Sequence, residues 1–142
     1  MTTTKTKKTT KQESATEVLE TTTKLLNIKQ PKEFKITEEG RKIIEDFKEY
    51  LVNNGNASAT VKSYIYDIHS FIEFIESEGI IFTGEFNITQ YTDYIKLQTE
   101  QSFKPNTINK RINSLQQFNI FLLMNKLMPG VIIILKIHKL PV

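Results

Sequence analysis

A segment near the carboxyl end of the chain carries polar and cationic side chains at helical spacing. They recur at steps of three or four residues within Lys104–Lys126, and they are Thr107, Lys110, Arg111, Ser114 and Gln117. No carboxylate interrupts this series. Hydroxyl, amide and cationic groups all donate hydrogen bonds to anionic oxygens, and the two cations add charge. The pattern predicts a helical surface that binds an anion.

A second segment, Ser58–Gly79, shows a related arrangement. Its polar face carries Thr60, Ser63, Tyr64 and Asp67. Its apolar positions agree with those of the first segment, because Thr60, Val61, Ile65, Ile68 and Phe71 match Thr107, Ile108, Ile112, Leu115 and Phe118. Two amphipathic helices of similar phase, or two related helical units, both explain this agreement. The matched threonines favour related units.

Composition narrows the classes of function. The 142 residues include no cysteine and two histidines, which argues against disulfides and a zinc site. We find no glycine-rich phosphate loop and no set of catalytic side chains, so we predict neither an enzyme nor a cofactor. The apolar run Val131–Leu135 is far shorter than the roughly 18 residues of a membrane span. We therefore expect a cytoplasmic protein with no membrane partner.

Charge is distributed unevenly around the net value of +3. Residues 101–142 contain six basic residues and no acid, whereas residues 37–100 contain five basic and twelve acidic residues. Such asymmetry suits a surface that meets phosphate on one side, and a solvated basic face without a partner stays an alternative.

Helical periodicity and end signals predict four helices and an all-α fold. The first begins after Thr37 and stops at Asn53–Gly55, and the second spans 58–78. The third begins at Asn87 or Thr89 and ends before Gln98, and the fourth spans 104–126 with a proline in its first turn. Residues 1–36, rich in Thr and Lys, are predicted to be a disordered tail, 37–127 a helical domain, and 128–142 an extended segment packed over it.

With these helices identified, the sequence resembles the N-terminal core-binding domain of tyrosine recombinases, the phage integrase family, which has a SAM-like four-helix fold. The resemblance covers about 37–142. It rests on Ser58, Thr60, Tyr64, Asp67 and Phe71, on the Ile88–Thr89 pair, and on Thr107, Ile108, Asn109, Lys110, Arg111, Ile112, Leu115 and Phe118. Two positions depart from the family pattern: Gln116 replaces a frequent basic residue, and Met128–Gly130 replaces an Asn-Pro pair.

The resemblance implies that the second and fourth helices approach the major groove of double-stranded DNA. Carried over by position, the DNA-binding residues are Thr60, Lys62, Ser63, Tyr64, Thr107, Lys110, Arg111 and Ser114, to which the polar face adds Gln117. Replacing Arg111 with Ala is expected to weaken DNA binding while the fold is retained. Self-association and recombinase partner subunits are open as protein partners.

In the family, a Leu-Pro linker leads to a catalytic domain, and this sequence stops at Leu140, Pro141 and Val142. We therefore expect DNA integration or recombination as the context, with no strand exchange by this chain alone. The alternative is a helical protein-interaction domain that uses its acidic helices.

Overall fold

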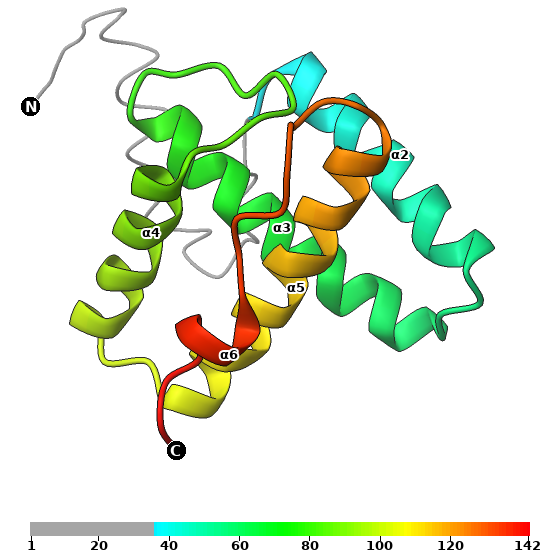
Figure 1. Cartoon of the computed structure of the whole chain (residues 1–142). Coiled ribbons are helices and arrows are strands. Elements are labelled where there is room, and N and C mark those ends of the chain that lie inside the picture. Colours follow the sequence, from blue (N-terminus) through cyan, green and yellow to red (C-terminus); the bar gives the residue numbers. More distant parts are fainter. Residues whose placement is uncertain (1–35) are drawn as a thin grey trace, which may run out of the picture. The chain divides into compact units, whose positions relative to one another are not determined.

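The computed structural model describes residues 36–142, and these residues form helices without any strand (Figure 1). The helices are α2 (Glu38–Asn53), α3 (Ser58–Ser77), α4 (Ile88–Glu100), α5 (Pro105–Met124) and the short α6 (Leu135–His138). The predicted all-α fold with four main helices is confirmed. The predicted disordered tail lies outside the described residues, apart from Ile36, which is buried.

The helix ends follow the sequence signals. The Thr37 side chain caps α2 by accepting from the Gly40 N–H, and Glu38 and Glu39 occupy the first turn, where acidic side chains favour the helix dipole. Asn87 and Gln90 form a capping box at the start of α4. Pro105 lies in the first turn of α5, where its missing N–H costs nothing.

One predicted boundary is wrong. We expected the third helix to end before Gln98, whereas α4 continues to Glu100. The apolar periodicity does break there, but Gln98 is buried and its side-chain oxygen accepts a hydrogen bond from Arg111 at 2.8 Å. A polar residue thus takes a core position because another helix supplies its partner.

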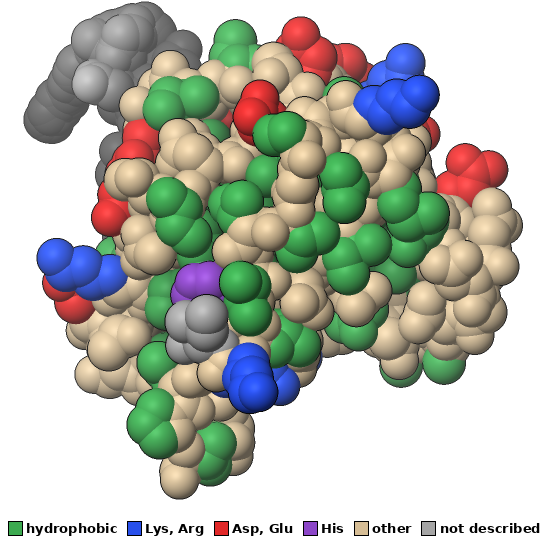
Figure 2. Space-filling view, viewed as in Figure 1, with side chains coloured by type: hydrophobic (Ala, Val, Ile, Leu, Met, Phe, Trp, Pro, Cys, Tyr) green, Lys and Arg blue, Asp and Glu red, His purple; other side chains and the backbone are tan. Residues whose placement is uncertain are grey.

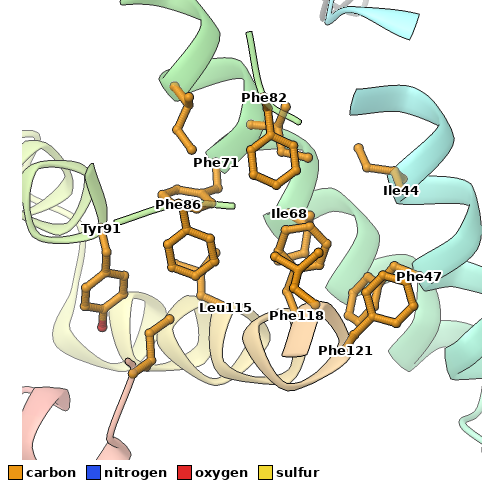
Figure 3. Close-up of a cluster of buried hydrophobic side chains, with 14 of the residues drawn as sticks. Ile44, Phe47, Ile68, Phe71, Phe82, Phe86, Tyr91, Leu115, Phe118 and Phe121 are labelled. Carbon is orange, nitrogen blue, oxygen red and sulfur yellow. The ribbon is translucent and has the colours of Figure 1, made fainter. Parts of the chain in front are cut away.

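Helices α3 and α5 are the central elements, because α3 contacts α2, α4 and α5, and α5 contacts α2, α3, α4 and α6. Aromatic side chains fill the space between these helices (Figure 3). Phe47 of α2 meets Phe118 of α5 edge to face, with ring centroids 5.1 Å apart. Phe71 of α3 meets Phe86 in the same manner at 5.0 Å. Edge-to-face pairs add to the free energy of apolar burial, so these contacts hold α2 against α5 and α3 against the connection that follows it.

The connection after α3 is tied back to the start of α2 by the Glu76 carboxylate. Its Oε1 accepts from the Thr37 N–H at 2.8 Å, and its Oε2 accepts from the Thr37 hydroxyl at 2.7 Å. Oε2 also accepts from the Phe82 N–H at 3.0 Å. Glu76 therefore joins three segments through one side chain.

The segment after α5 packs over the bundle (Figure 1). The buried Asn119 side chain accepts from the Ile132 N–H at 2.7 Å and from the Ile133 N–H at 3.2 Å, and it donates to the Gly130 carbonyl at 3.0 Å. The Asn109 amide exchanges two hydrogen bonds with the backbone of Leu140. Asn109 and Asn119 on α5 thus make the hydrogen bonds to the backbone of this extended segment that a neighbouring strand would make in a sheet. The short helix α6 is a single turn within the segment.

Candidate nucleic-acid interface

An open groove of about 400 Å³ lies between the first half of α3 and the middle of α5. Its lining residues are Ala59, Thr60, Ser63, Tyr64, Lys110, Asn113, Gln116, Gln117 and Leu135. Five of the nine residues predicted to bind DNA are therefore brought together, although they come from segments far apart in the sequence. None of the described residues that line the groove is acidic.

Beside this groove, a carboxylate is enclosed between α3 and α5. Asp67 is 1% exposed, and its Oδ2 accepts from Lys110 Nζ at 2.8 Å and from the Ser114 hydroxyl at 2.6 Å. Its Oδ1 lies 3.9 Å from Arg111 Nε and, among the described residues, accepts no hydrogen bond. A buried carboxylate requires opposite charge nearby, and these two cations supply it.

Arg111 is largely covered by other side chains and is not a fully exposed cation. Its side chain is 15% exposed, Nη1 donates to Gln98 Oε1 at 2.8 Å, and the guanidinium lies 4.5 Å from the centroid of the Phe103 ring. These contacts engage both the edge and the face of the guanidinium. Lys110, by contrast, keeps 52% of its side chain exposed.

The remaining predicted residues are placed differently. Ser114 is fully buried against Asp67, so its hydroxyl faces the protein interior. Thr107 is half-buried and Lys62 is exposed, and neither lines the groove. The structure thus divides the nine predicted residues into a groove set (Thr60, Ser63, Tyr64, Lys110 and Gln117), two that lie outside it, and two that pack internally.

Exposed cations lie on the same part of the molecule as the groove. Lys136 in α6 and Lys139 just after it are exposed, and α6 contacts α5. Figure 2 shows blue side chains around α6 without an adjoining red one, while red side chains gather mostly in the upper half of that view. The uneven distribution of charge along the sequence therefore corresponds to an uneven distribution of charged side chains on this face of the protein.

Burial shifts the pKa of three titratable groups, and it raises the pKa of the buried Tyr91. Burial raises the pKa of Tyr94, whose hydroxyl donates to Ser70 Oγ at 2.9 Å. Burial lowers the pKa of His69 below its usual 6.5, an effect that the Glu73 carboxylate opposes. None of these three groups lines the groove. Among the described residues, no cluster of three or more His, Cys, Asp or Glu side chains could hold a metal ion.

Sequence reasoning missed the role of Asp67 and the groove residues Ala59, Asn113, Gln116 and Leu135. A signal for Asp67 was present, since it is the first acidic residue of α3 and lies four positions after Ser63, on the same helical face. The position of Leu135 had no such signal, because the path of the final segment depends on the Asn119 contacts.

Comparison with known proteins identifies a family for this chain. No curated protein and no solved structure matches the chain. In the described part of the chain, no helix has both the length and the apolar character needed to cross a bilayer. The family model described as phage integrase, N-terminal SAM-like domain, matches residues 43–126, which is more than half of the sequence and includes both walls of the groove. The chain therefore belongs to the family of phage integrase N-terminal SAM-like domains.

Proposed function

We propose that this chain is a double-stranded DNA-binding module that serves site-specific recombination. The observation that carries the proposal is the groove between α3 and α5, where hydroxyls, amides and one lysine converge without an acidic lining residue from the described part of the chain. Such groups donate hydrogen bonds to phosphate oxygens and to the acceptor edges of bases. Membership of an integrase family supports DNA as the anion.

The exposure of each side chain and its position relative to the groove decide which contact with DNA we assign to it. Lys110 lines the groove and Lys62 is an exposed cation of α3, and we assign both to backbone phosphates. Thr60, Ser63 and Gln117 line the groove and are assigned to phosphate or base edges. Arg111 and Ser114 are left out of the contact set, because their polar groups are engaged inside the protein.

The proposal assigns binding, and not strand exchange, to this chain. A module with few phosphate-contacting cations binds weakly, and its affinity falls steeply with salt because each contact releases counterions. Cleavage and rejoining are assigned to a catalytic domain outside the residues described here.

The test is a fluorescence-anisotropy titration of the full chain with a labelled duplex at several salt concentrations. The double variant Lys62→Met and Lys110→Met should bind more weakly, with the slope of log K against log salt reduced by about two units. A matched control, Lys42→Met with Lys48→Met, removes the same charge from α2, where both lysines are exposed. It should leave the slope nearly unchanged.

Two results would contradict the proposal. Equal losses in the two double variants would mean that net charge, and not the groove, binds DNA. Absence of salt-dependent binding at low salt, from a chain shown to be folded by circular dichroism, would favour the alternative of a protein-interaction domain, whose apolar contacts respond little to salt.

A further inference from the structure

We infer that Asp67 competes with DNA phosphate for the Lys110 ammonium, so that this domain carries an internal restraint on its own affinity. The inference rests on the proposed DNA-binding function and concerns the regulation of the same groove. DNA binding would transfer Lys110 from the carboxylate to a phosphate, while Arg111 takes over the compensation of Asp67.

The two oxygens of Asp67 are used unequally. Oδ2 has two donors, Lys110 Nζ at 2.8 Å and the Ser114 hydroxyl at 2.6 Å. Oδ1 accepts no hydrogen bond from the described residues and faces Arg111 Nε at 3.9 Å. The carboxylate therefore has one oxygen that is saturated and one that can still accept a donor.

The two cations beside Asp67 differ in how easily their side chains can move away from the carboxylate. Lys110 is 52% exposed and lines the groove, so its ammonium can turn toward a ligand there. Arg111 is held by Gln98 and by the Phe103 ring and is 15% exposed. A small approach of Arg111 to Oδ1 would keep the buried carboxylate compensated once Lys110 turns away, which avoids the large cost of an unpaired buried charge.

Magnitudes decide whether Asp67 helps or hinders binding. Holding a lysine side chain in place saves at most a factor of about 30 in the binding constant, from side-chain entropy. A carboxylate and a phosphate on opposite sides of one ammonium, roughly 6 Å apart, repel each other by a factor of about 100 at an effective dielectric constant near 20. Repulsion exceeds preorganisation, so the carboxylate should weaken DNA binding.

The deciding experiment uses the double variant Asp67→Asn with Arg111→Gln in the full chain. It removes both buried charges together and leaves the net charge of the protein unchanged. We expect this variant to bind a random duplex about threefold more tightly than wild type, the ratio of these two opposing factors. The same pair of substitutions placed in a Lys110→Met background should produce no tightening, because the competing cation is absent.

A control for surface charge is Asp93→Asn, which removes an exposed carboxylate from α4. Its effect on affinity should be independent of Lys110. An independent variant is Ser114→Ala, which deprives Oδ2 of its hydroxyl donor and should strengthen the hold on Lys110. We expect about threefold weaker DNA binding from Ser114→Ala, and this variant decides the matter if the double variant is not folded by circular dichroism.

The outcomes separate this inference from the proposed function. Wild type that shows no salt-dependent binding overturns both. Wild type that binds, with a double variant of equal or lower affinity, overturns the competition and leaves DNA binding intact. Tightening that persists in the Lys110→Met background overturns it as well, because the effect would then not pass through this lysine. Unchanged or tighter DNA binding by Ser114→Ala would also overturn the competition between Asp67 and phosphate.

Discussion

Two carboxylates of α3, Asp67 in its middle and Glu76 at its end, are used in different ways. Glu76 accepts from two backbone N–H groups and one hydroxyl, and both of its oxygens are engaged. Asp67 is more deeply buried, yet its partners are two cations and one hydroxyl, and one oxygen accepts no hydrogen bond from the described residues.

The difference lies in what each arrangement permits. Neutral backbone donors cannot turn away without moving the chain, so Glu76 fixes the position of the segments that it joins. A lysine side chain has many rotamers and a solvated alternative, so the Lys110 contact with Asp67 can be exchanged without unfolding. The first carboxylate stabilises the fold, and the second adjusts the charge available in the groove.

The largest effect should come from Glu76→Ala. Loss of its acceptors leaves the N–H groups of Thr37 and Phe82 without these bonds, and we expect the free energy of unfolding to fall by about 3–4 kcal/mol. Denaturant unfolding measures this change. Glu78→Ala, at the exposed C-cap position of α3, serves as the control with a change within about 0.5 kcal/mol. Similar losses in the two variants would refute the special role of Glu76.

The second effect should come from Arg111→Met. This change removes the bond to Gln98 and the stacking on Phe103, so the free energy of unfolding should fall by about 2 kcal/mol. The salt slope of DNA binding should stay the same at a temperature where the variant is folded. A reduced slope with unchanged stability would restore the sequence-based expectation for Arg111 and show that the guanidinium leaves the interior to meet DNA.

A smaller effect on stability should come from Lys110→Met. Because the lysine is half exposed, we expect a change in the free energy of unfolding of less than about 1 kcal/mol. The salt slope of DNA binding should nevertheless fall by about one unit, measured by anisotropy. Arg111→Met should thus lower the stability and leave the salt slope unchanged, whereas Lys110→Met should lower the salt slope with little change in stability. If both variants changed stability and salt slope in the same way, the different roles assigned to the two cations beside Asp67 would be contradicted.

The smallest effect should be a pH dependence from His69, which lies between the two carboxylates on α3. Burial holds its pKa below 6.5 in the folded protein, so the unfolded chain binds the proton more readily. Its contribution to stability is fully present above pH 6.5 and is lost as pH falls from there through the folded pKa. Thermal melting at pH 7.5 and 6.0 should show a smaller decrease in His69→Gln than in wild type. An equal decrease would assign the pH dependence to other groups.

Much of the fold could be predicted because its signals are local. The start of α2 follows from Thr37, the start of α5 from Pro105, and the buried face of α5 from the apolar periodicity that includes Ile112 and Leu115. Asn119 falls on that same buried face, but the sequence could not show which backbone groups its side chain binds. The end of α4 was misplaced because Gln98 is a core residue only when Arg111 lies beside it.

In the candidate site, too, the features that depend on local sequence could be predicted, and those that depend on tertiary contacts could not. Residue types and spacing placed Thr60, Ser63, Lys110 and Gln117 on polar helical faces, and the structure gathers them in one groove. Spacing on a single helix could not show that Arg111 and Ser114 turn inward. Both are on the boundary between the apolar and polar faces of α5, where the neighbouring helices decide whether a side chain is covered.

The sequence by itself determined the helices, their buried faces and the unequal distribution of charge, because each depends on neighbours within a few residues of the chain. Only the tertiary structure decided which cations remain available to a ligand. Asp67 is separated from Lys110 by 43 positions and from Ser114 by 47, so their contacts exist only after α3 has packed against α5. Electrostatic energies depend on distance and burial, and packing fixes both.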